Sequence, residues 1–268
     1  TTIGFTTNLW GFYQNPELWT ELFNHPRMGV GTSFNYGDGR RITLERVYTV
    51  DIFWKVSDKF LEYCGYRPSF ISVVTGDESE ETIIDNVRLA KEMGVVCKLN
   101  YANASGRQKN PFVPSKLWKI YLRIEELGLA QWEFNTNQIL NGLVEATICP
   151  LSRDCDEHIR AINPNGDMYS CGAFADDQEK AIDYEDEIFN GNLARPLSDD
   201  MELHALKDEC YSCPMFKLCN GCRKTIKDLK DADAVEIHCV QMKEIAPQLI
   251  EKNFKGQADE VLRQKQLV

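Results

Sequence analysis

Hydrophobic and polar positions alternate with two different periods along the first half of the chain. Up to about residue 135, short runs rich in β-branched and aromatic residues are separated by longer segments with the apolar spacing of amphipathic helices. Strands are predicted at Ile3–Asn8, Gly29–Phe34, Phe70–Thr75, Val95–Tyr101 and Ala130–Phe134, and helices at Pro16–Phe23, Val50–Tyr63, Glu80–Met93 and Ser115–Leu127. This alternation is typical of βα units that build a parallel sheet, so the predicted fold class is α/β.

After residue 149 the alternation stops, and short turns, acidic loops and closely spaced cysteines follow. The segments His158–Ile162 and Met168–Cys171 flank the turn sequence Asn-Pro-Asn-Gly. This arrangement predicts a β-hairpin in which Gly166 takes a positive φ. A helix is predicted after Cys239, as far as about residue 253.

The length and charge of the chain narrow the possible classes of protein. We expect two unequal domains, residues 1–135 and an irregular, cysteine-rich part over residues 136–268. With 30 basic and 41 acidic residues, the net charge of −11 repels nucleic acid, which we exclude as a partner. No apolar run approaches the roughly 18 residues that span a bilayer, so no membrane partner is expected. The N-terminal sequence lacks the features of a secretory signal, and we expect a cytoplasmic location.

Ten cysteines give the strongest chemical signal in the sequence. Cys64 and Cys97 stand apart in the α/β part, where buried structural thiols are expected. The other eight come late in the chain and are Cys149, Cys155, Cys171, Cys210, Cys213, Cys219, Cys222 and Cys239. Four of these eight fall within one C-x2-C-x5-C-x2-C segment, and such a density needs a soft metal or disulfides.

Three explanations of these eight thiols are possible, namely zinc sites, disulfide bonds and iron–sulfur clusters. Zinc ribbons separate their two C-x2-C pairs by roughly 15–20 residues, whereas a C-x5-C spacing joins Cys213 to Cys219 here. Disulfide bonds remain an alternative because the number of cysteines is even. The α/β part, however, is typical of a cytosolic enzyme that needs no covalent links. Eight thiolates suit two iron–sulfur clusters with four cysteines each, which is the interpretation we favour.

The spacing Cys155-x10-Gly166-x4-Cys171, followed by the four-cysteine segment and a late cysteine, resembles the SPASM domain of radical S-adenosylmethionine (SAM) enzymes. The family usually has C-x3-C where this chain has Cys219-x2-Cys222. The resemblance implies two auxiliary 4Fe–4S clusters. It assigns Cys149, Cys155, Cys171 and Cys222 to one cluster, and Cys210, Cys213, Cys219 and Cys239 to the other.

The α/β part carries elements similar to those of the barrel in the same family. Thr6-Thr7-Asn8 resembles the end of the family's third strand, and Gly31-Thr32-Ser33 resembles its fourth-strand serine. The resemblance implies a partial (β/α)6 radical SAM barrel, in which Thr7 and Ser33 contact the amino-acid end of S-adenosylmethionine. No C-x3-C-x2-C motif for a third, catalytic 4Fe–4S cluster occurs in the sequence. We therefore expect the chain to cover the barrel from the third strand onward, and the full-length protein to bind S-adenosylmethionine and that third cluster.

The resemblance implies an enzyme that abstracts hydrogen from a peptide or protein side chain, as in crosslink or thioether formation. Its implied partners are the peptide or protein substrate and an electron donor such as flavodoxin or ferredoxin, with the auxiliary clusters in electron transfer. Asn100, Asn103 and Arg107 follow the fourth strand, where they could face a ligand or simply hold a loop. The alternative function is a non-catalytic scaffold that binds zinc or a cluster and recognises a peptide.

Overall fold

The computed structural model of the chain describes residues 2–37, 42–43, 46–102, 113, 115–140, 161–169, 229, 232–245, 247–248 and 251–252. The chain divides into two compact units. The first unit comprises Thr1–Tyr101 and Lys119–Gln138, and the second comprises Ala102–Trp118 and Ile139–Val268. The first unit contains a parallel sheet, and the second contains a hairpin and the last described helix.

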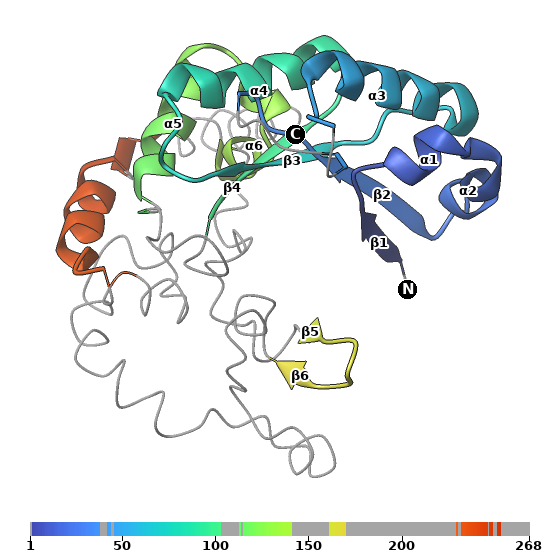
Figure 1. The fold of residues 1–268 in the computed structure, drawn as a ribbon. Coiled ribbons are helices and arrows are strands. Elements are labelled where there is room, and N and C mark those ends of the chain that lie inside the picture. The colour runs from blue at the N-terminus through green and yellow to red at the C-terminus, as the bar shows by residue number, and fades with distance from the viewer. Residues whose placement is uncertain are drawn as a thin grey trace, which may run out of the picture. The chain divides into compact units, whose positions relative to one another are not determined.

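A four-stranded parallel sheet forms the centre of the first unit (Figure 1). Its strands are β1 (Ile3–Thr6), β2 (Met28–Ser33), β3 (Phe70–Val74) and β4 (Cys97–Tyr101). They lie side by side in the order of the sequence, with Ile3 opposite Met28 and Phe70 opposite both Thr32 and Cys97. The predicted α/β class and four of the five predicted strands are confirmed.

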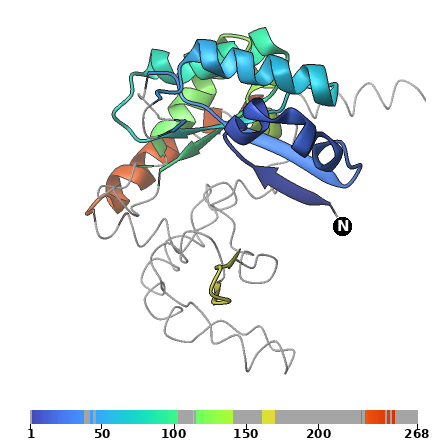
Figure 2. The ribbon, with the colours of Figure 1, turned by 45° about the vertical axis from the view of Figure 1, so that its right-hand side comes forward.

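Helices connect each strand to the next. The connections are α1 (Trp10–Gln14) and α2 (Pro16–Phe23), then α3 (Val50–Cys64), then α4 (Glu80–Met93). All four helices lie over the same face of the sheet, as Figures 1 and 2 show. Crossovers between parallel strands are right-handed, and the strand order never reverses, so every crossover helix falls on one side. After β4 come α5 (Ser115–Glu126), the 3-10 helix η1 (Ala130–Trp132) and α6 (Phe134–Leu140).

Capping residues set the bounds of the two longest crossover helices. The hydroxyls of Thr49 and Ser79 each accept from the N–H of the third helical residue, which begins α3 and α4 respectively. Each helix ends where a glycine takes a left-handed conformation, Gly65 with a φ of 80° and Gly94 with a φ of 68°. These signals are local, and the predicted bounds of both helices are correct to within one residue.

Aromatic side chains fill the space between the helices and the sheet. One cluster joins α1, α2, α3 and β2 through six buried apolar side chains, Leu9, Phe12, Phe23, Val30, Val56 and Phe60. A second cluster centres on Phe34 and Phe53, whose rings stack with their centroids 4.5 Å apart. Tyr48 and Phe70 lie edge-on to this pair. Since burying one such side chain is worth about 1.5–3 kcal/mol, this interface contributes substantially to the stability of the first unit.

The fifth predicted strand, Ala130–Phe134, is wrong. Its first three residues form η1, and α6 begins at Phe134. Of this segment, Glu133 alone pairs with β4, through a single parallel bridge to Cys97. The short helices α1 and α6 were not predicted, because five and seven residues are too few to show a helical period.

The predicted hairpin of the second unit is present. Strands β5 (Ala161–Ile162) and β6 (Met168–Tyr169) pair antiparallel. Gly166 has a φ of 91°, and its N–H donates to the Asn163 carbonyl at 2.8 Å, so glycine is needed at this turn position. Residues 235–245 are helical, and the predicted C-terminal helix therefore begins before Cys239 instead of after it.

Candidate functional site

The carboxyl ends of the four parallel strands meet at one edge of the sheet, where parallel α/β folds bind their ligands. Hydroxyl and amide side chains lie at or just after each strand end. They are Thr6, Thr7 and Asn8 at β1, Ser33 and Asn35 at β2, Thr75 at β3 and Asn100 at β4. We call this set of residues the carboxyl edge, and it is the candidate functional site of the first unit.

The corner between β1 and α1 has a strained backbone. Leu9 is buried and has a φ of 58°, a left-handed conformation that is unusual for a bulky residue. Thr7 Oγ1 accepts from the Leu9 N–H at 3.3 Å, and Asn8 Oδ1 accepts from the Trp10 N–H at 3.0 Å. The Tyr48 hydroxyl donates to the Asn8 carbonyl at 3.3 Å. These contacts hold a conformation that costs about 1–2 kcal/mol, and such outliers are concentrated at functional sites.

The two predicted cofactor contacts, Thr7 and Ser33, lie at the ends of neighbouring strands. The Thr7 N–H donates to the Gly31 carbonyl at 3.1 Å, and Ser33 is the last residue of β2. Val30 and Thr32 are buried, so alternation places Gly31 and Ser33 on the opposite, open face. Thr6 Oγ1 lies 3.8 Å from the point where a side chain on Gly31 would begin, on that same face. Thr6 is therefore the β1 hydroxyl that shares a face with Ser33, which strand alternation alone would have shown.

Two buried asparagines fix the segment that follows β2. Asn35 Oδ1 accepts from the Val73 N–H at 3.0 Å, and Asn35 Nδ2 donates to the Val73 carbonyl at 2.5 Å. The side chain thus continues the ladder between β2 and β3 where the backbone has left it. Asn86 Oδ1, from α4, accepts from the Tyr36 N–H at 2.9 Å. Neither asparagine was predicted as a site residue.

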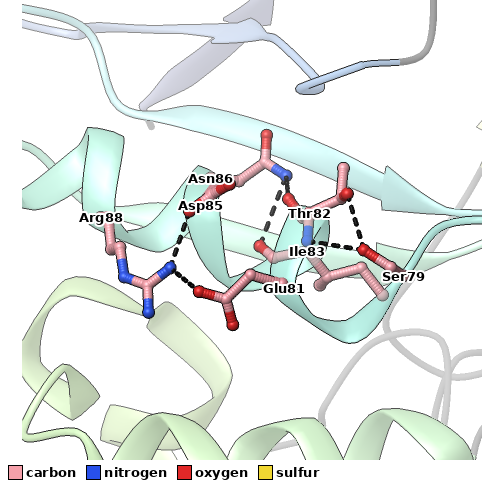
Figure 3. A network of polar contacts seen from close by, with 7 residues as sticks. All are labelled: Ser79, Glu81, Thr82, Ile83, Asp85, Asn86 and Arg88. Atoms are coloured by element: carbon pink, nitrogen blue, oxygen red, sulfur yellow. Dashed lines mark hydrogen bonds and ion pairs between the residues drawn. The ribbon is translucent and has the colours of Figure 1, made fainter.

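Figure 3 shows the polar contacts that Asn86 and its neighbours make within α4. The carboxamide turns back toward the first turn of the helix, where Nδ2 donates to the Thr82 carbonyl at 3.0 Å. Farther along the same helix, Arg88 forms ion pairs with Glu81 and Asp85, which both precede it. Exposed ion pairs of this kind are worth about 0–1 kcal/mol. These ion pairs join residues of α4 to one another, whereas the buried Asn86 amide also binds the segment after β2.

The turn after β3 holds a carboxylate of the chain itself. The oxygens of Glu78 accept from the N–H groups of Thr75 and Gly76, at 3.0 Å each, and from the Thr75 hydroxyl at 2.9 Å. Successive N–H groups in a turn form an anion-binding concavity. Glu78 occupies this concavity, and the polar groups after β3 are satisfied internally.

Side chains complete the outer edge of β4. Glu133 is fully buried, and its carboxylate accepts from the N–H groups of Leu99 at 3.0 Å and Thr136 at 2.6 Å. Asn135 Nδ2 donates to the Leu99 carbonyl at 2.7 Å and to the Tyr121 hydroxyl at 2.8 Å. Both backbone groups that Leu99 could offer to another strand are therefore occupied. Burial raises the pKa of Glu133, and the hydrogen bonds from Leu99 and Thr136 oppose that shift in part.

Asn100 differs from the other amides of the carboxyl edge. Its Oδ1 is buried and has no hydrogen-bond partner among the described residues. The registers of β2, β3 and β4 place Asn100 on the same open face as Ser33. A buried acceptor without a donor costs about 1–3 kcal/mol, so a ligand with an N–H or O–H group is favoured here. Asn103 and Arg107 lie outside the described residues.

Among the predicted cluster ligands, Cys239 alone lies within the part of the chain that the structure describes, half-buried on the helix over residues 235–245. The other seven lie outside it and are Cys149, Cys155, Cys171, Cys210, Cys213, Cys219 and Cys222. The described residues contain no group of three or more His, Cys, Asp or Glu that could hold a metal ion. Cys97 is buried and Cys64 half-buried, and burial raises the pKa of both thiols.

Comparisons with known proteins add no family to this picture. No protein-family model matches the chain, and neither does any curated protein or solved structure. No helix in the described ranges is long and apolar enough to cross a membrane. The cysteine spacing and the geometry of the carboxyl edge are thus the observations on which a function can be based.

Proposed function

We propose that the chain belongs to a radical SAM enzyme that modifies a peptide or protein side chain by hydrogen abstraction. The observation that carries this proposal is the spacing of eight late cysteines, which follow the residues of a parallel α/β sheet in the sequence. A C-x10-G-x4-C hairpin segment, a four-cysteine segment and the late Cys239 provide enough thiolates for two 4Fe–4S clusters. A single zinc site would leave half of these thiols without a role.

The order of the strands supports a barrel. In a doubly wound sheet the strand order reverses and helices cover both faces, whereas here the order is sequential and α1–α4 lie over one face. A twisted sheet of this kind can curl around its helix-free face, as barrel sheets do. If β1 corresponds to the third strand of a (β/α)6 barrel, then β1–β4 correspond to its third to sixth strands. The side chains of Glu133 and Asn135 then complete the edge of the last strand.

Exposed apolar side chains at the β1 edge of the sheet favour the presence of further strands beside β1. Ile3 and Phe5 of β1 expose 56% and 43% of their surface, although the Phe5 ring lies 6.0 Å from the ring of Phe23. Leu18 and Leu22 of α2 expose 67% and 45%. Parallel sheets are normally buried on both faces. A further strand–helix unit beside β1 and α2 would cover these four apolar side chains.

The carboxyl edge fits the amino-acid end of S-adenosylmethionine, which carries an ammonium and a carboxylate group. Ser33 and Thr6 offer hydroxyls on the open face, and Asn100 offers a buried acceptor for an N–H donor. Thr7 would contribute through the corner that its hydroxyl fixes at Leu9. S-adenosylmethionine held here together with a catalytic 4Fe–4S cluster would supply the radical chemistry for hydrogen abstraction. The residues of this chain would hold and orient the cofactor beside the peptide.

The late cysteines fit two auxiliary clusters with complete protein ligation. Cys149, Cys155, Cys171 and Cys222 would hold one cluster, and Cys210, Cys213, Cys219 and Cys239 the other. Four thiolates per cluster leave no iron free for the substrate, so electron transfer away from the substrate is the favoured role of these clusters, with a flavodoxin- or ferredoxin-like protein as the electron donor of the enzyme. The half-buried position of Cys239 suits a cluster ligand, since burial and hydrogen bonds to the sulfurs set the potential of such clusters.

Metal analysis of the chain, purified without oxygen, tests this proposal. We expect about eight irons and eight sulfides per chain and a brown colour. In Cys239→Ser the iron content should fall to about four or fewer, because one cluster loses a ligand. The matched control is Cys64→Ser, which lies outside the late group and should keep the iron content of the wild type. Stoichiometric zinc without colour would favour the peptide-binding scaffold instead, and thiols that react only after reduction would favour disulfides.

A further inference from the structure

We draw no further inference here: the strongest candidate, the apolar flank that Ile3 and Phe5 of β1 form with Leu18 and Leu22 of α2, carries none of its own, because the proposed barrel already accounts for it and nothing in the described residues shows what covers it.

Discussion

Replacement of Glu133 by glutamine tests how the sheet ends at β4. Glutamine has nearly the same shape, and its carbonyl oxygen can still accept from the Leu99 N–H, which donates at 3.0 Å in the wild type. Its amide nitrogen then takes the place of the oxygen that lies 2.6 Å from the Thr136 N–H. Two donors would face each other in a fully buried position. The Thr136 hydroxyl can rotate to accept, but the Thr136 N–H cannot.

The expected loss follows from this one contact. A hydrogen bond to a charged group is worth about 1.5–3 kcal/mol, and burying a neutral amide in place of a carboxylate returns part of that amount. At a pH where the carboxyl group is ionised, we therefore expect the free energy of unfolding to fall by about 1–2 kcal/mol in Glu133→Gln. Glu133→Ala leaves the N–H groups of both Leu99 and Thr136 unpaired, and should cost about 3–5 kcal/mol.

The effect of the glutamine variant should depend on pH in a defined direction. Burial raises the pKa of Glu133 in the folded chain, so folding favours the neutral carboxyl group. The wild type therefore gains most stability below the ordinary pKa, and loses it as the pH rises through the raised value. Glutamine does not titrate. The stability advantage of the wild type over Glu133→Gln should be largest at about pH 4 and should narrow toward neutral pH.

Urea unfolding at several pH values, followed by far-UV circular dichroism, measures these differences. Hydrogen exchange of the Leu99 and Thr136 amides reports the same contacts locally, and a loss of about 1.4 kcal/mol corresponds to tenfold faster exchange. Glu126→Gln is the matched control, since Glu126 is an exposed partner of Arg123 and its loss should cost under about 1 kcal/mol. If Glu133→Gln equals the wild type at every pH and both amides stay equally protected, the carboxylate does not complete the edge of β4.

Two further predictions concern Asn35 of the carboxyl edge and Leu9 at the corner between β1 and α1. Asn35→Leu removes both hydrogen bonds to Val73 and should lower the free energy of unfolding by about 2–4 kcal/mol. Asn35→Asp keeps the acceptor for the Val73 N–H and should lose less, an order that urea unfolding checks. Leu9→Ala should cost about 2–5 kcal/mol through lost burial. Leu9→Gly should be more stable than Leu9→Ala by about 1 kcal/mol, because glycine adopts a φ of 58° freely. If thermal unfolding gave a higher melting temperature for Leu9→Ala than for Leu9→Gly, the inference of backbone strain at Leu9 would be contradicted.

The sequence predicted the elements whose signals are local and repeated. The strands with runs of apolar residues, the helices with capping residues and the hairpin with glycine at its turn all lie close to their predicted bounds. The segment from Ala130 to Phe134 was misjudged because its apolar and polar residues alternate as they do in a strand, although its first three residues form a 3-10 helix. Its glutamate uses the side chain to reach the Leu99 N–H that a strand would reach with its backbone. Hydrophobic periodicity contains no information about a side chain that takes the place of a backbone hydrogen-bond partner.

The candidate site could be predicted only in part, for the same physical reason. The motif at the end of β1 and the serine of β2 lie at the carboxyl edge as expected, because strand ends follow directly from the strand assignment, while their contact with a cofactor stays a prediction. Asn35 and Asn86 were missed because their partners, Val73 and Tyr36, lie 38 and 50 residues away in the sequence. A polar residue after a strand is common, and no local signal distinguishes an amide that pairs with backbone from one that faces solvent.

The parallel sheet and the cysteine-rich segment make separable contributions to the proposed function. The sheet supports a barrel through its sequential order and its one-sided helices, and this support stands even if the late thiols bind zinc. The clusters rest on cysteine spacing, and iron bound by the chain would support them even if the sheet were not part of a barrel. The enzyme proposed here combines both features. Iron that is lost in Cys239→Ser and kept in Cys64→Ser would therefore establish the clusters, while the reaction would still depend on the cofactor binding at the carboxyl edge.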